Sequence, residues 1–353
     1  MAFGEGGNRW LRALMKGRWH VEAGREEGAV AQEGTRCRLD AGRRTIDVEI
    51  GAEQSGARMP EQKQLHLFGT GGEGTPVEGI APAGVVVREV SCRSLLNRCG
   101  IDDYSFNCYT GCAHACAYCY ARFMQRFHPH DEPWGGFVDV KINGPAVLTR
   151  EVRRLPPGSV FTCSACDGWQ SVEKHYELTR RCCALLLEAG FGLNVLTKSE
   201  LVLRDLDIFA GRDVSLGVTI TTTDEREARV WEPRASSVGA RVKVLREAKK
   251  AGLKTRVMFG PLLPEISDTA EELRRLFDLA REAGVDRIWT DAMNPRPRVW
   301  PAVRELLMRV RPDLVEHYRG VLFDSVSRER YIRELQGRIA RAAAEAGMKD
   351  RMG

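Results

Sequence analysis

The sequence predicts an α/β protein whose parallel sheet is curled into a partial (β/α)6 barrel similar to a TIM barrel. From about residue 86, short runs rich in β-branched residues alternate with amphipathic stretches. This alternation is typical of βα units on a parallel sheet. Six such units can be counted, too few for a closed eight-stranded barrel, but right-handed crossovers still curl the sheet.

Residues 1 to 85 precede this pattern and are expected to form a flexible arm. They are rich in Gly, Glu, Arg and Gln and contain the linker-like stretch "GTGGEGTPVEG". Only "TIDVEIG" (45–51) alternates like a strand, and "RWLRALMKGRW" (9–19) is compatible with a short basic helical turn. Neither segment is long enough to be a domain.

The barrel is expected to span residues 86–310, with its first strand just before Cys112. Five further strands are predicted: "SVFTCS" (159–164), "LNVLTKS" (193–199), "VSLGVTIT" (214–221), "KTRVMFG" (254–260) and "RIWTDAM" (287–293). A helical pattern follows each strand, for example residues 171–190, where Gly190 supplies a stop signal. Residues 311–353, including "RERYIRELQGRIARAAAEAG", are expected to form a helical extension.

Composition limits the class of protein. The 353 residues are 43% hydrophobic and 29% charged, enough to bury a sizeable core. No apolar run is long enough to span a bilayer, and no secretory leader is evident. We therefore expect a cytoplasmic protein that does not associate with a membrane. The net charge of +5 is compatible with a polyanionic partner but does not require one.

Cysteines are unusually dense in one part of the chain. Eight of the eleven lie between Cys108 and Cys183. Disulfides are rare in a reducing compartment, so this density indicates metal binding or redox chemistry.

The stretch "NCYTGCAHACAYCYAR" (107–122) contains the most specific motif. Cys112, Cys116 and Cys119 form C-x3-C-x2-C, with the aromatic Tyr118 before the last cysteine. Three thiolates on one tight loop can hold three irons of a 4Fe-4S cluster and leave the fourth iron open to a small molecule. The alternative is a structural zinc site that adds Cys108. Zinc sites usually join two separated cysteine pairs, so the single loop favours the iron–sulfur interpretation, and Cys108 is not assigned to the cluster.

This motif resembles that of the radical S-adenosylmethionine (SAM) superfamily. Further blocks, in order along the chain, resemble its spore photoproduct lyase-like branch over roughly residues 86 to 310: "CDGWQSVEKHYELTR", "VLTKSELVLRDLDIF", "GVTITTTDEREARVWEPRASSVGARVKVLREAKKAG" and "GPLLPEISD". The resemblance implies that SAM binds the open iron and is cleaved reductively to a 5'-deoxyadenosyl radical. Spore photoproduct lyase itself repairs a thymine dimer in DNA.

The resemblance also suggests a hydrogen-donating cysteine near the end of the strand at 159–164. Cys163 and Cys166 flank that place, and either is a candidate donor, since a thiol has a weak S–H bond. The alternative is that one or both are small core residues. Cys182 and Cys183, in the middle of a predicted helix, are expected to be core residues.

Further residues at strand ends are expected to bind SAM. Lys198 resembles a lysine that contacts the SAM carboxylate, and Thr219 matches a hydroxyl position near the ribose. Ser164 and Ala165 occupy the strand end that contacts the SAM amino group, although the Gly-Gly-Glu type of motif found there in the superfamily is missing. Tyr118 belongs to the cofactor-binding loop. Asp167 is expected either to bind a ligand or to cap the helix near Ser171. Glu232 is expected either to order the loop after the strand at 214–221 or to be a purely structural residue.

A second motif lies in the arm. "QLHLF" (Gln64, Leu65, Leu67 and Phe68 with His66 between them) resembles the bacterial sliding-clamp binding peptide. Such a segment would place its apolar side chains in a pocket of the clamp. The alternative is a short apolar patch that packs on the barrel.

Together these features predict a radical SAM enzyme with a lyase-like reaction that acts on DNA or another nucleic acid. The alternatives are a radical SAM enzyme for a small molecule or peptide, and a zinc-stabilised nucleic-acid-binding module. Expected partners are DNA, the sliding clamp, and an electron donor such as flavodoxin or ferredoxin.

Overall fold

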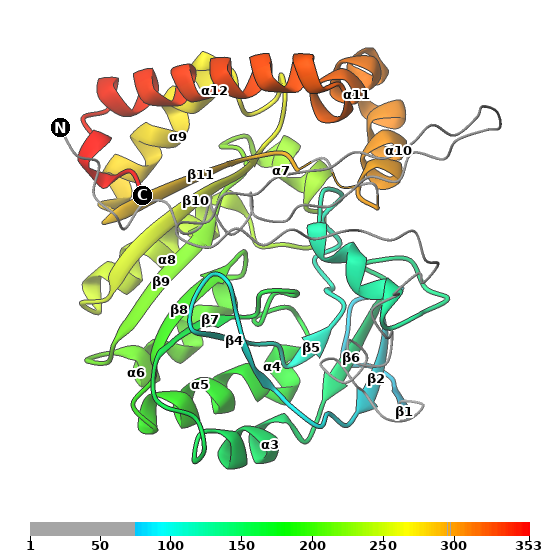
Figure 1. Ribbon diagram of the computed structural model, residues 1–353, viewed down its shortest axis with the longest axis vertical. Coiled ribbons are helices and arrows are strands. Elements are labelled where there is room, and N and C mark those ends of the chain that lie inside the picture. Colours follow the sequence, from blue (N-terminus) through cyan, green and yellow to red (C-terminus); the bar gives the residue numbers. More distant parts are fainter. Residues whose placement is uncertain (1–74, 295, 297) are drawn as a thin grey trace, which may run out of the picture.

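The computed structural model describes residues 75–294, 296 and 298–353 (Figure 1). The predicted strand at 45–51, the basic turn at 9–19 and the clamp-like peptide at 64–68 lie outside the described residues. What the structure describes contains two sheets and the helices around them.

The larger sheet has seven strands in the order β11-β10-β9-β8-β7-β4-β3. Six of them are parallel, in agreement with the predicted (β/α)6 arrangement, and the short β3 pairs antiparallel with β4 at one edge. The strands are β3 (Leu96–Arg98), β4 (Tyr104–Phe106), β7 (Ser159–Thr162), β8 (Gly192–Thr197), β9 (Val214–Thr219), β10 (Lys254–Leu262) and β11 (Arg287–Ala292). The five strands that were predicted by residue range are therefore found within three residues of their expected ends, whereas the first strand, expected just before Cys112, ends earlier at Phe106.

Three of the helices that follow the strands begin at capping side chains. Asp224 caps α7, Ser237 caps α8 and Thr269 caps α9, each accepting a backbone N–H of the first helical turn. The helices of this part are α3 (Gly144–Glu151), α4 (Glu173–Tyr176), α5 (Leu178–Glu188), α6 (Leu206–Phe209), α7 (Glu225–Trp231), α8 (Val238–Lys250) and α9 (Ala270–Ala283). The apolar faces of these helices cover one side of the sheet. The loops at the carboxyl ends of the strands are not part of this packing, and in barrels of this kind they carry the functional site.

The segment 171–190, expected to be one helix, is two. Glu177 lies in the left-handed region, with φ at 53°, between α4 and α5. The buried carboxylate of Glu173 accepts the backbone N–H groups of Thr179 at 2.9 Å and Arg180 at 3.0 Å. This carboxylate satisfies donors at the start of α5, which stabilises a separate helix start there.

A second, four-stranded sheet was not anticipated. Its order is β1-β2-β6-β5, with β1 (Thr75–Val77), β2 (Val86–Val90), β5 (Tyr109–Thr110) and β6 (Phe137–Lys141). Strand β1 lies within the region expected to be a flexible arm, so that expectation is wrong for Thr75–Val77. Pairing with β2 gives these residues backbone partners that their polar, Gly-rich context did not suggest.

The helical extension after the barrel is present. It comprises α11 (Val315–Phe323) and α12 (Ser325–Glu345), while α10 (Trp300–Val310) falls within the range expected for the barrel, and α12 packs on α9 at the top of Figure 1. Arg338 donates to Asp268 at 3.0 Å across this contact. Beyond α12, Met352 forms a parallel bridge with Ile288 on β11.

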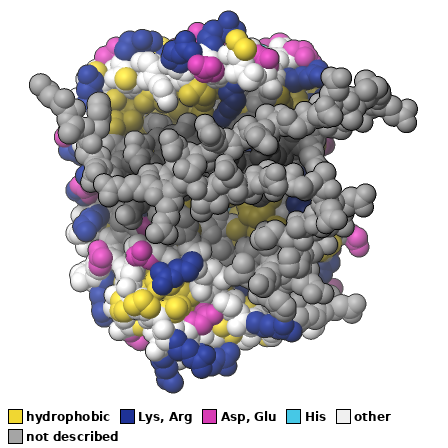
Figure 2. Space-filling model, viewed as in Figure 1, with side chains coloured by type: hydrophobic (Ala, Val, Ile, Leu, Met, Phe, Trp, Pro, Cys, Tyr) yellow, Lys and Arg dark blue, Asp and Glu magenta, His cyan; other side chains and the backbone are white. Residues whose placement is uncertain are grey.

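No helix of the described residues is long and apolar enough to cross a membrane. On the face shown in Figure 2, Lys and Arg side chains lie along the top and bottom of the molecule with Asp and Glu among them. This mixed surface gives little electrostatic preference for a particular partner.

Candidate functional site: the cysteine loop at the carboxyl end of the barrel

The cysteine motif lies on a loop that follows β5 and is fixed by residues from distant parts of the chain. Gly111 begins it with φ at 85°, and a Cβ there would lie 2.4 Å from the Phe137 carbonyl oxygen. The buried Gln170 accepts the Ala113 N–H at 2.7 Å and donates to the Gly111 carbonyl at 3.3 Å. Arg234 donates to the Ala113 carbonyl at 3.1 Å. The loop is therefore held from both sides.

The three cysteines of the motif lie in protected positions. Cys112 and Cys116 are buried and Cys119 is half-buried. Burial raises the pKa of each thiol, and the nearby Asp167 carboxylate and the other two thiols add to this effect at Cys112. The Ala121 N–H opposes it by bonding the Cys119 sulfur. Deprotonating this set is therefore unfavourable unless positive charge is supplied.

Cys108 is hydrogen-bonded to a thiol of the core. It is fully buried, and its Sγ donates to the Cys182 Sγ at 3.6 Å. The four-thiolate zinc site would need Cys108 as its fourth ligand, and this geometry directs that thiol into the core instead. Cys182 and Cys183 are themselves fully buried core residues, as expected.

Tyr118 anchors the loop to the strands through a buried polar network. Its hydroxyl donates to the Glu232 carboxylate and lies 3.0 Å from Thr221 Oγ1. Arg241, only 1% exposed, forms an ion pair with Glu232 and donates to the Thr219 carbonyl at 3.0 Å. Arg241 and Lys198 lower the pKa of Glu232 against the opposing effect of burial, so it is ionised. Glu232 therefore links the Tyr118 loop to Thr221 after β9 and to Arg241 on α8.

Lys198 and Thr219 lie at the carboxyl ends of β8 and β9. Lys198 directly follows β8, and its Nζ lies 5.6 Å from the centre of the Tyr118 ring. Cys116 and Glu232 raise the pKa of Lys198 against the effect of burial, which keeps the ammonium charged beside the loop. Thr219 ends β9 and is buried.

Asp167 joins two strand ends and also binds the backbone of the turn that follows it. Its carboxylate accepts the Thr197 hydroxyl at 2.7 Å and the Lys198 N–H at 2.8 Å, and no side chain caps α4 at its start. Asp167 Oδ1 also accepts the Trp169 N–H at 2.9 Å, so it caps the turn that leads to α4 and not α4 itself. Asp167 fixes the carboxyl ends of β7 and β8 relative to each other, and with them the position of Lys198.

The segment after β7 brings four of the predicted residues together. Cys163 is buried and Cys166 is half-buried. A hydrogen bond to the Cys166 sulfur, together with burial, raises the pKa of Cys163. Ser164 Oγ accepts from Asn107 at 3.2 Å, and Asn107 Oδ1 accepts the Ala165 N–H at 2.7 Å. Asn107 therefore ties this segment to the residue that follows β4.

Two site residues were missed from the sequence. Asn107 stands directly after β4, and the rule that strand ends carry function would have found it had the end of β4 been placed correctly. Tyr120 directly follows Cys119, and its hydroxyl donates to the Ser164 carbonyl. The guanidinium of Arg296 lies 5.7 Å from the centre of its ring. Its position as a second aromatic residue next to Cys119 could have identified Tyr120 from the sequence.

The donor set fits an iron–sulfur cluster better than a single ion. Among the described residues, no three His, Cys, Asp or Glu side chains converge as the ligands of one metal ion do. A cubane cluster is bound through separate irons, so its thiolates need not converge on one point. The three thiols of the loop and the Lys198 ammonium suit a group that carries its own positive metal ions and sulfides.

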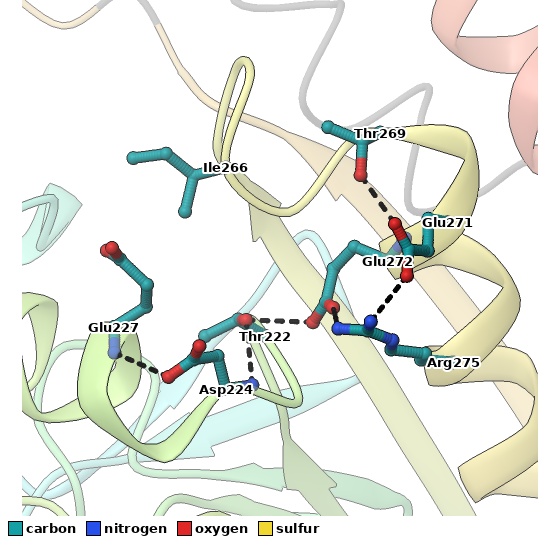
Figure 3. A pocket seen from close by; sticks show the side chains of 8 residues that line it. All are labelled: Thr222, Asp224, Glu227, Ile266, Thr269, Glu271, Glu272 and Arg275. Atoms are coloured by element: carbon teal, nitrogen blue, oxygen red, sulfur yellow. Dashed lines mark hydrogen bonds and ion pairs between the residues drawn. The ribbon is translucent and has the colours of Figure 1, made fainter.

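A separate cavity of about 160 Å³ lies between the starts of α7 and α9 (Figure 3). Its acidic groups are largely engaged in the fold: Glu272 accepts the Thr222 hydroxyl at 2.8 Å, Asp224 caps α7, and Glu271 is paired with Arg275. Glu271 and Arg275 form a pair on one exposed helix face. This cavity contains none of the cysteines and is part of the helix-capping network.

Comparisons with known proteins agree with this geometry. The family model described as "Radical SAM superfamily" matches residues 106–280. An uncharacterized protein of Mycobacterium tuberculosis is 31% identical over 250 residues, 67% of this chain and 73% of the relative. An uncharacterized protein of Methanocaldococcus jannaschii is 32% identical over 166 residues, 47% of this chain and 62% of the relative.

Solved structures show the same fold at low identity. Spore photoproduct lyase complexed with dinucleoside spore photoproduct aligns with a TM-score of 0.58 and 14% identity, covering 78% of this chain and 86% of that one. A mutant of the same enzyme with bound AdoMet and dinucleoside spore photoproduct aligns with a TM-score of 0.59 and 16% identity over the same shares. The three-cysteine loop, the parallel strands that carry it and these matches lead to one assignment: the chain belongs to the radical SAM superfamily and has the fold of spore photoproduct lyase.

Proposed function

We propose that this enzyme binds a 4Fe-4S cluster through Cys112, Cys116 and Cys119 and cleaves SAM reductively, and that its substrate is DNA or another nucleic acid. When bound, the cluster and SAM together supply a 5'-deoxyadenosyl radical. The observation that carries the proposal is the grouping of the cysteine loop, Lys198 and a thiol pair at one end of the same parallel strands.

The residues of the chain have separate roles in this proposal. Lys198 holds the SAM carboxylate through a charge-assisted hydrogen bond. The contacts that raise its pKa keep the ammonium charged for this role. Thr219 is placed for the ribose, and Ser164 and Ala165, held by Asn107, for the SAM amino group. Because both neighbouring strands are tied by Asp167, these groups are oriented before SAM binds.

The proposal of a nucleic-acid substrate is supported by similarity to other proteins and not by the geometry of the site. The branch that the sequence blocks resemble includes a DNA-repair lyase, and the similar solved structures carry a dinucleoside photoproduct. Identity of 14% to 16% supports the fold and leaves the substrate to experiment. A lyase-like repair reaction is therefore the proposal to test first.

The test is anaerobic reconstitution of the full chain with iron and sulfide, followed by SAM and dithionite. Ultraviolet-irradiated DNA, the dinucleoside photoproduct, undamaged DNA and a mixed peptide pool are compared as substrates. We expect about four irons per chain and 5'-deoxyadenosine formation. The amount of photoproduct in irradiated DNA or in the dinucleoside should fall, while undamaged DNA and the peptides should stay unchanged. Formation of 5'-deoxyadenosine with turnover of peptides alone would retain the radical chemistry and reject the nucleic-acid substrate.

Recruitment partners form a further part of the proposal. The peptide of Gln64, Leu65, Leu67 and Phe68 is proposed to bind the bacterial sliding clamp, and flavodoxin or ferredoxin to supply the electron. A free peptide must offset its own ordering, so we expect micromolar affinity for the clamp, about 7 to 8 kcal/mol. Replacing Leu67 and Phe68 with Ala should remove clamp binding and leave iron content unchanged. Unchanged clamp binding, or none in the original chain, would reject the tether.

A further inference from the structure

Trp134 lies on a segment that is packed tightly against the cysteine loop. The next residue, Gly135, has φ at 96°, and a Cβ there would come within 2.5 Å of the Ala115 Cβ. Arg234 donates to the Gly135 carbonyl at 2.7 Å and to the Ala113 carbonyl at 3.1 Å. The main chain beside Trp134 is therefore fixed against the loop that carries the three cysteines.

The Trp134 side chain packs in a small apolar cluster with residues of this loop. The cluster consists of Cys112, Ala121, Met124, Trp134 and Phe137, and Cys119, Phe123, Ala165 and Cys166 pack against it. The Trp134 and Phe137 rings meet edge to face, with their centroids 5.9 Å apart. Sulfur is the only acceptor that the side chains of this cluster offer to a hydrogen-bond donor.

The indole N–H of Trp134 is a buried donor. The residue is 5% exposed, and among the described residues its Nε1 has no hydrogen-bond partner. A buried tryptophan N–H usually finds a partner, because leaving it without one costs free energy. An orphaned donor of this kind is explained where a bound group supplies the acceptor.

The neighbouring thiol agrees with this placement. Burial raises the pKa of the Cys119 thiol, and Trp134 is one of the groups that oppose this shift. Opposition is the direction expected of an N–H near the sulfur, since a donor favours the thiolate. It matches the packing of Cys119 on the same apolar cluster as Trp134.

We propose that the Trp134 indole N–H donates a hydrogen bond to a sulfur atom of the bound 4Fe-4S cluster or of its thiolate ligands, and thereby makes the cluster easier to reduce. This inference rests on the proposed function, because it requires the cluster. Reduction adds negative charge to the cluster and its sulfur ligands. A donor stabilises the more negative state more strongly, so it raises the reduction potential.

The position of Trp134 matters because the site gathers negative charge. Burial raises the pKa of the Cys112 thiol, and the Asp167 carboxylate adds to this effect. A reduced cluster held there adds further negative charge. In the proposed function the Lys198 ammonium, directly after β8, is paired with the SAM carboxylate. The Trp134 N–H, on the segment before β6, remains to stabilise the added electron.

Trp231 is the competing donor. Its Nε1 is also buried and has no partner within the described part of the chain, and its carbonyl accepts the Ala117 N–H of the loop at 3.0 Å. However, its ring stacks on those of Tyr118 and Tyr318, with centroids 6.4 Å and 6.2 Å away, and it belongs to the main core. Trp231→Phe is therefore the matched control, because it removes a second buried indole N–H outside the small apolar cluster.

The first test detects the hydrogen bond directly. The full chain is produced with tryptophan that carries nitrogen-15 in the indole ring, reconstituted anaerobically and reduced with dithionite in the absence of SAM. Pulsed electron paramagnetic resonance then measures the coupling between the cluster electron and nearby nuclei. We expect a nitrogen-15 coupling in the original chain and in Trp231→Phe, and none in Trp134→Phe. A reduced cluster without this coupling in the original chain would overturn the proposal.

The second test measures the reduction potential of the cluster by a redox titration in the absence of SAM. Trp134→Phe keeps an aromatic ring and removes the N–H. At a fixed potential its ratio of reduced to oxidised cluster should fall about tenfold, which corresponds to a potential about 59 mV lower. Trp231→Phe should titrate with the original chain, and all three should bind about four irons. An unchanged potential in iron-loaded Trp134→Phe, or an equal fall in Trp231→Phe, would contradict the proposal.

These outcomes differ from failure of the proposed function. An original chain that binds no iron would reject the cluster itself. If Trp134→Phe alone does not bind iron, the nitrogen-15 coupling still decides between the two indoles. Coupling that persists in Trp231→Phe supports Trp134, whereas coupling that is lost in Trp231→Phe assigns the hydrogen bond to Trp231 and rejects the proposal.

Discussion

The two ends of the barrel both place polar side chains on the same parallel strands, and they use them differently. At the amino end, Asn194 donates to both oxygens of Asp102 at 2.9 Å and accepts from Arg256 at 3.0 Å. The Arg256 guanidinium also stacks 4.7 Å from the centre of the Trp289 ring. At the carboxyl end, the loop thiols lie near the Lys198 ammonium. Burial disfavours the charged form of both kinds of group: it raises the pKa of the Cys112 thiol and acts to lower that of Lys198.

The difference separates a structural polar cluster from a working one. The amino-end groups bind mainly one another, so their contribution is to folding. Burial lowers the pKa of Arg256 to about 10, and Asp102 opposes that shift. At the carboxyl end, Lys198 offsets only part of the effect of burial on the pKa of Cys116, and bound metal ions would supply the remaining positive charge. Polarity inside a barrel therefore does not by itself identify a site.

The largest expected effect comes from removing a loop thiol. Cys112→Ala, Cys116→Ala or Cys119→Ala should abolish iron binding and 5'-deoxyadenosine formation, because three thiolates are the minimum ligand set. The iron-free protein should unfold within about 1 kcal/mol of the original chain. Cys92→Ala, a buried thiol elsewhere, is the matched control. Retained iron in any of the three variants would remove that residue from the ligand set.

The amino end should show the opposite behaviour. Arg256→Met leaves Asn194 Oδ1 and the Val195 carbonyl without their donor, so the free energy of unfolding should fall by about 2 to 4 kcal/mol. Urea unfolding of the iron-free protein measures it. Lys254→Met on the same strand, an exposed side chain, should change stability by less than about 0.5 kcal/mol. Iron content should be unchanged in both; a loss of iron in Arg256→Met would show that the ends are coupled.

A pH-dependent effect is expected at Asp291, near the carboxyl end of β11. Burial raises its pKa to about 6, against Arg328 and Arg296. The folded state therefore binds this proton more tightly than the unfolded state, and stability falls as pH rises from about 4 to 6 and then levels off. Asp291→Asn should be more stable than the original chain by about 3 kcal/mol at pH 7.5 and equal to it near pH 4. Parallel unfolding curves at both pH values would contradict this.

The smallest effect is expected at Cys108. Cys108→Ala removes the contact with Cys182 and leaves a small void, which should cost about 1 kcal/mol of unfolding free energy. Iron stoichiometry should be the same as in the original chain. Iron loss in this variant would return the four-thiolate zinc interpretation to consideration.

Sequence periodicity predicted the larger sheet well because its strands are short apolar runs between strong helix signals. The strands at Val214–Thr219 and Lys254–Leu262 were predicted in this way. The smaller sheet escaped prediction because its strands pair only through tertiary contacts: Tyr109–Thr110 has two residues, too few for a pattern.

Site prediction succeeded where chemistry is encoded locally and failed where it depends on folding. The cysteine spacing and the position of Lys198 at a strand end were readable. The roles of Gln170 and Arg241 were not, because each acts on residues far away in the sequence. Asp167 was partly misread, since its carboxylate bonds a neighbouring strand that sequence spacing cannot place.

The two edges of the seven-stranded sheet are short or covered. One edge is the three-residue β3, and on the other side the outer edge of β11 receives Met352, while the Gly353 N–H donates to the Ile288 carbonyl at 2.9 Å. A sheet that does not close on itself offers unpaired backbone groups to strands of other molecules, and such groups seed aggregation. Shielding β11 in this way favours solubility at high concentration. Changes to these last residues would therefore appear first as self-association, before any loss of chemistry.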